Sequence, residues 1–349
     1  MALNAVFHLI SLIVKLVLTE TISLNSAKRE NRQLLTYGKY LRQKLGARTF
    51  KVPVSISGFT CPNIDGSVAR GGCTFCENES FSPSLNKVQP LKKFYLNLES
   101  EENPYLEKQL EQLKLQFDAL SPKLRRNNKA EKFLVYFQSF TNTYAPFETL
   151  KALYDKALEF DDVVGLSIGT RSDSITEETL EYLAELSKKH EIWVEYGIQS
   201  VYDETLERIN RGHDSANVEK WIKKTKELGI NVCGHVIFGL PEESEEMMLH
   251  TMEKAIEWGI DSIKIHSLYV MERTALANEH AIGKFKPIDE DSYIDVLVKA
   301  VQMLPKNVSI QRLSAGIDDK SLIDPSWCKD KQRSMTNIRR ALEQNGMKY

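Results

Sequence analysis

The chain has 349 residues, of which 42% are hydrophobic and 27% are charged, the balance of an enzyme able to bury a sizeable core. The formal net charge of −2 and the isoelectric point near 6.4 exclude a general electrostatic attraction to nucleic acid, so any polyanion would have to meet a local basic patch. Five cysteines are few for this length and odd in number, which disfavours a disulfide framework.

The chain begins with an apolar stretch, residues 2–18, which raises the question of a membrane or targeting segment. The stretch contains His8 and Lys15, is short for a membrane span, and lacks the basic start and small-residue cleavage site of a signal peptide. We therefore expect no stable membrane insertion and treat residues 1–33 as an N-terminal extension. A packed helix, a membrane-surface or signal role, and a start placed too early in the sequence all stay open for it.

From Arg48 onward, strand-like and helix-like segments alternate, which is the pattern of a parallel sheet with crossover helices. The predicted strands are Phe50–Ser57, Phe133–Phe137, Val163–Ile168, Ile192–Tyr196, Asn231–Ile237, Ser262–His266 and Val308–Gln311. The predicted helices are Tyr105–Leu120, Pro146–Leu158, Thr176–Lys188, Ala216–Leu228, Ser244–Trp258 and Ser292–Met303. This alternation predicts the fold class α/β, a partial (β/α)6-type TIM barrel with short N-terminal and C-terminal helical extensions.

The barrel is expected to span residues 34–312, and residues 313–349 are expected to form a tail whose helix, Lys331–Gln344, packs on the barrel. The basic segment Ser121–Lys132 is predicted to be a solvated loop, with an RNA-facing patch as the alternative. The active site of such a barrel lies at the carboxyl ends of its strands.

Three of the five cysteines lie in one loop at that end of the first strand, with the spacing C-x11-C-x2-C at Cys61, Cys73 and Cys76. Soft thiolates select zinc, copper(I) or iron–sulfur clusters. Structural zinc usually takes four protein ligands, and this loop contains no histidine. Three cysteines fit better with a 4Fe-4S cluster that leaves its fourth iron open for a small molecule, although zinc stays open on spacing alone.

The loop ends in Cys-Thr-Phe-Cys, with Phe75 between the last two cysteines, and this ending resembles that of radical S-adenosylmethionine (SAM) enzymes. The usual first spacing of that superfamily is C-x3-C, whereas eleven residues separate Cys61 from Cys73 here. The longer gap resembles that of the Elongator catalytic-subunit branch. The sequence motifs FTCPN and RGGCTFC of this loop are most similar to those of the YhcC-like branch. The resemblance implies that Cys61, Cys73 and Cys76 hold the cluster and that Phe75 lies beside SAM.

Polar residues follow the second and third strands. The second strand runs into FQSFTNTYAP, which resembles the YhcC-like family and implies that four side chains contact the amino-acid part of SAM. These are Gln138, Ser139, Thr141 and Asn142. A polar turn before a helix starting at Pro146 is the alternative. The third strand ends in GTRSD, where Arg171 has either a site role or a structural one.

The fourth strand continues as VEYGIQSVYDETLERINRGHD, which is also similar to the radical SAM coproporphyrinogen dehydrogenase branch. That similarity implies that Gln199 contacts the ribose of SAM, that Ser200 is a secondary contact, and that Arg211 binds the carboxylate, for which a guanidinium is well suited. Glu195, on the same strand, could meet a ribose hydroxyl.

The fifth and sixth strands offer fewer signals. His235 lies on an otherwise apolar strand before a Gly-Leu-Pro turn that resembles the adenine-side wall of the superfamily, and it is either a hydrogen-bonded core histidine or a cofactor contact. Cys233 reads as a buried small hydrophobe. Period-two spacing places Lys264 and His266 on one face, with Tyr269 just beyond, and these residues are expected to line the floor or the substrate side of the cavity.

The resemblance implies an enzyme that accepts one electron from a flavodoxin or ferredoxin, cleaves SAM to methionine and a 5′-deoxyadenosyl radical, and abstracts hydrogen from a substrate. The substrate and further catalytic residues stay unassigned. RNA is a candidate substrate by kinship with the Elongator subunit, and the need for a cytosolic reductant implies a cytoplasmic location. Two alternatives stay open, namely an iron–sulfur electron-transfer protein without SAM contacts and a zinc-stabilised nucleic-acid-binding module.

Overall fold

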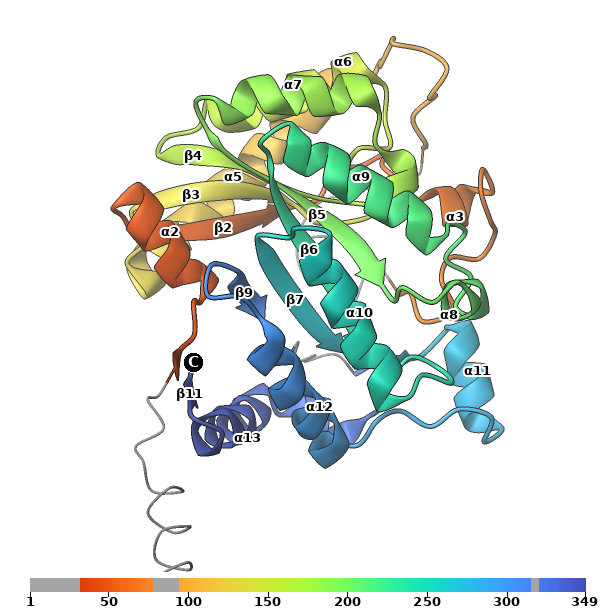
Figure 1. Ribbon diagram of the computed structural model, residues 1–349. Helices are drawn as coiled ribbons and strands as arrows, with labels where there is room; N and C mark the ends of the chain where they lie inside the picture. Colours follow the sequence, from red (N-terminus) through yellow and green to blue (C-terminus); the bar gives the residue numbers. More distant parts are fainter. Residues whose placement is uncertain (1–31, 78–93, 315–319) are drawn as a thin grey trace, which may run out of the picture.

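Seven parallel strands form one curled sheet at the centre of the molecule, and helices cover its outer face (Figure 1). The computed structural model describes residues 32–77, 94–314 and 320–349. The sheet has the order β2-β3-β4-β5-β6-β7-β9, so its strands lie side by side in the same order as they occur in the chain. Its strands are β2 (Thr49–Val54), β3 (Lys132–Phe137), β4 (Val163–Thr170), β5 (Glu191–Gln199), β6 (Asn231–Phe238), β7 (Ser262–Ser267) and β9 (Ser309–Arg312).

Four of the six crossover helices begin at a side chain that caps their first turn, which explains why they start where they do. For example, the Ser244 hydroxyl accepts a hydrogen bond from the Met247 amide at the start of α10 (Glu245–Glu257), and the Asp214 carboxylate accepts one from the Asn217 amide at the start of α9 (Ser215–Glu227). The helices that follow strands of the sheet are α5 (Leu106–Asn128), α6 (Phe147–Leu158), α7 (Glu177–Ser187), α9 (Ser215–Glu227), α10 (Glu245–Glu257) and α12 (Glu290–Met303).

The two faces of the strands differ in chemistry. Residues such as Val52, Ile168 and Val194 pack into the main hydrophobic core under the helices. The alternate positions carry polar side chains such as Lys51 and Glu195, which bond to one another across the strands. Because successive strand residues point to opposite faces, the concave interior of the sheet is lined by polar groups while its outside is apolar.

The predicted fold is confirmed. Each of the seven predicted strands and six predicted helices is present, with ends that move by at most a few residues except at α5. The loop predicted over Ser121–Lys132 is wrong, because α5 continues to Asn128. Leu120 and Leu124 extend the apolar face of that helix against the core, and Pro122 lies on its exposed side.

Several short elements were not predicted from the sequence. They are α2 (Tyr37–Leu45), α3 (Pro62–Asp65), α8 (Asp203–Arg208) and α11 (Ala275–Ala281), with the small strands β1 (Arg32–Gln33), β8 (Val270–Met271), β10 (Leu322–Asp324) and β11 (Met347–Lys348). At the C-terminus, α13 (Lys331–Gln344) packs against α12, and β11 pairs in parallel with β1.

The sheet does not close into a full barrel. Its edge strands are β2 and β9, and α2 lies against both of them. The apolar stretch at residues 2–18 lies outside the described residues. Among the helices that the structure does describe, none has the length and apolar character needed to cross a membrane.

Candidate active site

The three loop cysteines meet at one cavity at the carboxyl ends of the strands. Cys61 precedes α3, and its carbonyl accepts hydrogen bonds from the first amides of that helix; the Cys76 amide donates to the Cys73 carbonyl at 2.9 Å. All three cysteines line a cavity of about 160 Å³, which we call the cluster cavity. Burial raises the pKa of Cys76, and the neighbouring Cys73 and Cys61 raise it further. The three thiols are therefore close enough to interact electrostatically.

The spacing of the thiols matters for the choice of metal. A single tetrahedral zinc with bonds of about 2.3 Å holds its sulfur ligands roughly 3.8 Å apart. Among the described residues, the one group of three side chains with all ligand atoms within 4.8 Å of one another is Glu195, Cys233 and His235. The loop thiols are therefore set more widely than one zinc ion needs, which favours a larger polynuclear centre.

Asn63, in α3, holds the cysteine loop in place, and the sequence analysis missed it. Its side-chain nitrogen donates to the carbonyls of Asn210 and Arg211 at 2.6 and 2.8 Å, and its distance to the Cys73 sulfur is 3.6 Å. In return, the Asn210 side chain donates to the Gly72 carbonyl at 2.7 Å. These bonds fix the cysteines relative to the segment that carries Arg211. No motif or periodicity in the sequence signals this role.

Arg211 and Gln199 come together at the end of β5. The register of β5 shifts between Gly197 and Gln199, and Gln199 takes a φ of 66°, a left-handed conformation that is rare for a residue with a side chain. One Arg211 nitrogen donates to the Gly197 carbonyl at 2.9 Å, and another lies 3.8 Å from the Cys73 sulfur. The Nε of Arg211 is buried without a hydrogen-bond partner among the described residues. Both side chains line the cluster cavity.

The remaining predicted contacts separate into two groups. Gln138 and Thr141 line the cluster cavity with the cysteines. Ser139, Asn142 and Ser200 are buried and do not line it.

The second group bonds within the protein. Ser139 bonds to the Ser55 hydroxyl, and Asn142 donates to the carbonyls of Phe137 and Gly169 at 3.1 and 2.9 Å. Ser200 donates to the Glu243 carboxylate. These bonds brace the turns at the strand ends rather than placing polar atoms in the cavity.

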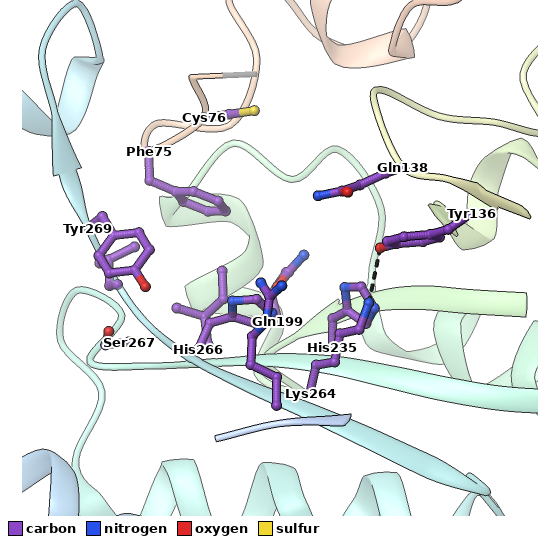
Figure 2. A pocket seen from close by; sticks show the side chains of 13 residues that line it. Phe75, Cys76, Tyr136, Gln138, Gln199, His235, Lys264, His266, Ser267 and Tyr269 are labelled. Carbon is purple, nitrogen blue, oxygen red and sulfur yellow. Dashed lines mark hydrogen bonds between the residues drawn. The ribbon is translucent and has the colours of Figure 1, made fainter. Parts of the chain in front are cut away.

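A second cavity of about 210 Å³ adjoins the first, and we call it the substrate cavity (Figure 2). Cys76, Gln138, Gln199 and His235 line both cavities. Figure 2 shows Phe75 and Tyr269 on one side of the substrate cavity and Lys264 with Tyr136 across from them. The predicted placement of Lys264, His266 and Tyr269 along this cavity is confirmed.

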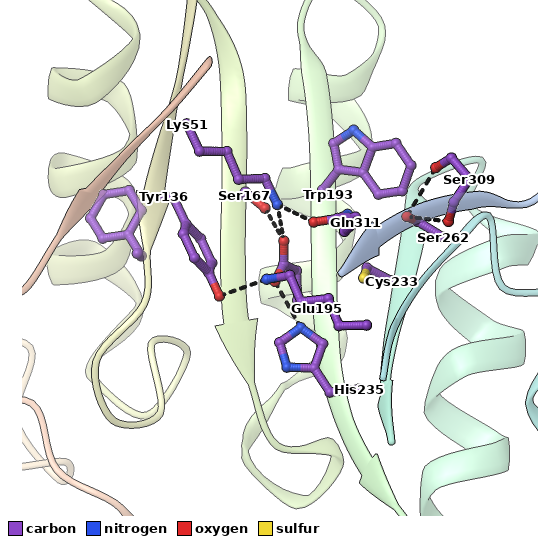
Figure 3. Close-up of polar contacts among 12 residues, drawn as sticks. Lys51, Tyr136, Ser167, Trp193, Glu195, Cys233, His235, Ser262, Ser309 and Gln311 are labelled. Carbon is purple, nitrogen blue, oxygen red and sulfur yellow. Dashed lines mark hydrogen bonds and ion pairs between the residues drawn. The ribbon is translucent and has the colours of Figure 1, made fainter. Parts of the chain in front are cut away.

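Glu195 lies at the centre of a buried charge network inside the sheet (Figure 3). Lys51, Lys264 and Ser167 donate to its carboxylate, and His235 Nε2 donates to it at 2.8 Å. These cations and hydrogen bonds outweigh the cost of burial and hold the pKa of Glu195 well below its usual range. Glu195 also lines the cluster cavity, but all four of these donors are already bonded to its oxygens.

The same network sets the charge of its other members. Burial, followed by the charge of Lys264, lowers the pKa of His235 to about 4, so this histidine is neutral at pH 7. Burial lowers the pKa of Lys51 to about 8. Two lysines beside Glu195, Cys233 and His235 repel a metal cation, so this trio is a poor metal site despite its short spacing. Cys233 is fully buried, as predicted.

Comparisons with known proteins assign the family. The model described as "Radical SAM superfamily" matches residues 66–255, and that described as "Radical_SAM C-terminal domain" matches residues 260–344. The chain therefore belongs to the radical SAM superfamily. It is similar along most of its length to Protein YhcC of Escherichia coli, with 31% identity over 312 residues that cover 89% of this chain and 93% of that protein.

Two further similarities are more partial. A tRNA uridine(34) acetyltransferase of Methanocaldococcus infernus is 31% identical over 164 residues, which are 46% of this chain and 30% of that protein. The solved structure of Elp3 from M. infernus has a TM-score of 0.55 at 18% identity and covers 85% of this chain and 64% of that chain, which supports the shared fold.

Membership of the superfamily confirms three predictions made from the sequence. The chain is an enzyme, its chemistry depends on SAM, and its cofactors are a 4Fe-4S cluster and SAM. The predicted similarity to the YhcC-like branch is confirmed as well.

Proposed function

We propose that Cys61, Cys73 and Cys76 hold the 4Fe-4S cluster and that Gln199 and Arg211 hold SAM beside it. The observation that carries this proposal is that all five side chains line one cavity at the carboxyl ends of the strands. This is where barrel enzymes place their reacting groups. Gln138 and Thr141, which line the same cavity, would contact the amino-acid part of SAM.

Arg211 is the residue best suited to orient the cofactor. Its Nε is a buried donor with no partner in the part of the chain that the structure describes, and such a group is costly unless a ligand bonds to it. A carboxylate would satisfy it and form a charge-assisted hydrogen bond. The same guanidinium lies near the Cys73 sulfur and would offset part of the negative charge of three thiolates. Arg171 supports this placement by donating to the Arg211 carbonyl at 2.8 Å.

When bound and reduced by a flavodoxin or ferredoxin, the cluster and SAM supply a 5′-deoxyadenosyl radical that abstracts hydrogen from the substrate. The chain's own contribution is to position the substrate and exclude water. Phe75 and Cys76 bring the cysteine loop to the substrate cavity, and Tyr136 and Lys264 lie across that cavity from Phe75. We propose that the reaction takes place in the cytoplasm, where such reductants are present.

RNA is the substrate class that the relatives favour. The similarity to a tRNA uridine(34) acetyltransferase covers 46% of this chain, and the name of that protein specifies a tRNA uridine. The kinship alone is an analogy, so the substrate must be argued from this chain's own surface.

The test of the proposed function is anaerobic reconstitution with iron and sulfide, followed by reduction in the presence of SAM. We expect about four irons per chain and release of 5′-deoxyadenosine, as the stoichiometry of a 4Fe-4S centre requires. A reduced cluster that never cleaves SAM would instead support the electron-transfer alternative. Equimolar zinc without iron in anaerobically purified protein would support the zinc-stabilised module.

Substitution of Gly197 with alanine tests the SAM contacts separately from the cluster. A Cβ at this position would lie 2.7 Å from both an Arg211 nitrogen and the Gln199 side-chain nitrogen, so both side chains must shift. We expect at least a tenfold loss in 5′-deoxyadenosine formation at limiting SAM, on the order of the 1.4 kcal/mol lost from one displaced contact.

Iron content serves as the internal control for this variant, since Gly197 lines the cluster cavity but has no side chain that could bind the cluster. Iron is expected to stay at the wild-type level, while the SAM concentration needed for half-maximal cleavage rises. An unchanged dependence on SAM would show that Gln199 and Arg211 do not contact the cofactor.

A further inference from the structure

A groove runs along the open edge of the sheet, where β2 and β9 do not pair. It has a volume of about 920 Å³ and is lined by residues of α2, β2, β9 and the start of α13. We call it the open-edge groove. Seven of its lining residues are basic, and no Asp or Glu side chain lines it among the described residues. The basic residues are Lys39, Arg42, Arg48, Lys51, Lys264, Arg312 and Lys331.

The inner end of the open-edge groove reaches the active site. Tyr136, Gln138, Lys264 and Arg312 line both this groove and the substrate cavity. Gln138 also lines the cluster cavity. A molecule that enters beside α2 therefore meets a continuous set of lining residues that ends where the reacting hydrogen would lie.

The charges at the inner end are not balanced within the protein. Lys51 and Lys264 share one carboxylate, that of Glu195, and His235 is neutral at pH 7. The backbone of Arg312 pairs with β7, whereas its side chain forms no hydrogen bond or ion pair with the described residues and is only partly exposed. A surplus of buried positive charge is costly unless a ligand anion compensates it.

Unpartnered polar atoms in the groove wall point to the same conclusion. The Tyr37 hydroxyl and the Gln311 side-chain nitrogen are buried without hydrogen-bond partners among the described residues, and both residues line the groove. Buried polar groups are nearly always bonded in native proteins, so these two donors await a ligand or water.

Aromatic side chains are interleaved with the cations. Phe50 and Tyr349 are partly exposed in the groove, and Tyr37 and Tyr136 lie deeper. A basic groove combined with aromatic faces is how proteins bind single strands, because the cations follow the phosphates and the rings stack on the bases. A duplex has its bases already stacked and gains nothing from these rings.

We propose that the open-edge groove binds a single-stranded RNA segment and leads one nucleotide to Lys264 and Arg312 at the substrate cavity. Lys39, Arg42, Arg48 and Lys331 lie at the exposed outer end, where they would contact phosphates of the flanking nucleotides. The inference rests on the proposed function for the reaction itself. The groove is separate from the cysteine loop, so RNA binding can be tested apart from SAM cleavage.

The test is binding of a fluorescent 20-nucleotide single-stranded RNA to the reconstituted full chain at salt concentrations from 50 to 200 mM. The comparison is a variant with Lys39→Gln, Arg42→Gln and Lys331→Gln, all at exposed positions. Each lost phosphate contact lowers the salt slope by about 0.7, so three lower it by about 2.1. Between these salt concentrations, wild-type affinity should therefore fall roughly 20-fold further than that of the variant.

The matched control removes three charges elsewhere, with Lys123→Gln, Arg126→Gln and Lys129→Gln at the exposed end of α5. This control should bind RNA like the wild type. Loss of binding in the control, with none in the groove variant, would overturn the proposal and place RNA on α5. Equal binding of single-stranded DNA would overturn the assignment to RNA, and equally tight binding of AMP would replace the strand with a small phosphorylated substrate.

The two proposals fail in different ways. Release of 5′-deoxyadenosine is measured in the wild type and in the α5 control without RNA. If neither releases it, the proposed function fails, whereas the binding result still decides the open-edge groove.

Discussion

Replacing Cys73 with alanine is expected to abolish both iron retention and SAM cleavage. Cys73 is buried between Asn63 and Arg211, whose side chains approach its sulfur, so no other thiol can take its place. If the chain ligates the cluster through three cysteines, as we propose, the two that remain cannot hold it. Iron and sulfide analysis after reconstitution should give background values, and 5′-deoxyadenosine should be undetectable.

Cys328→Ala is the matched control for this experiment. Cys328 is even more buried than Cys73 but lies beside Ser267, and it lines none of the three cavities. Its removal should leave iron content and SAM cleavage at wild-type levels. If the Cys73→Ala protein keeps a cluster that cleaves SAM, then the assignment of the ligands to this loop is wrong.

The fold could be predicted because parallel strands covered by helices leave a strong pattern in the sequence. Segments such as Ile192–Tyr196 read as short apolar runs between turn residues, and each was followed by a helical pattern. The end of α5 was missed because Ser121–Lys132 is basic and contains Pro122. Its apolar signal was present, however, since Phe117, Leu120 and Leu124 continue one helical face.

The candidate site could be predicted only in part. Spacing and family resemblance identified the cysteines, Gln199 and Arg211, which the structure brings to one cavity. The resemblance also predicted Ser200 as a secondary SAM contact, whereas in the structure its hydroxyl donates to the Glu243 carboxylate on a neighbouring turn. A sequence motif gives the order of residues, whereas the direction of a side chain after a bulge such as Gly197–Gln199 depends on the register of the sheet.

The interior charge network could not be predicted for a related reason. Lys51, Glu195 and Lys264 lie on three different strands, separated by more than 60 residues in the chain. Period two placed Lys264 on the interior face, but its partner is decided by the alignment of neighbouring strands. The open-edge groove has the same origin, because its cations come from α2, β2, β7, β9 and α13.

Replacing Glu195 with glutamine is expected to lower the free energy of unfolding at pH 7 by about 3 kcal/mol. The amide keeps the size of the side chain but removes the charge that compensates Lys51 and Lys264, both of which are largely buried. Urea denaturation of wild type and variant at pH 7 measures the difference. The matched control is Glu257→Gln, whose pairing with Lys254 is exposed and is expected to contribute at most about 1 kcal/mol.

The loss of stability in the Glu195→Gln variant should depend on pH, whereas a loss caused by a packing defect would not. The pKa of Lys51 in the folded wild type is lowered to about 8 from its usual 10.5, so above pH 8 the unfolded chain binds more protons and stability from this group rises with pH. Without the Glu195 carboxylate the folded-state pKa of Lys51 falls further, so the variant gains more stability than the wild type as the pH rises. The difference between the two proteins should therefore narrow from pH 7 to pH 10.

Stability at acid pH provides a second test of the same charge network. The pKa of Glu195 is held well below its usual 4.5 by the two lysines, so its stabilisation is complete above pH 4.5 and is lost as the pH falls through the folded-state value. The difference between wild type and Glu195→Gln should thus be largest near neutral pH and decrease in both directions. A difference that stays constant from pH 4 to pH 10 would mean that the glutamine disturbs packing, and that Lys51 and Lys264 carry no uncompensated charge toward the open-edge groove.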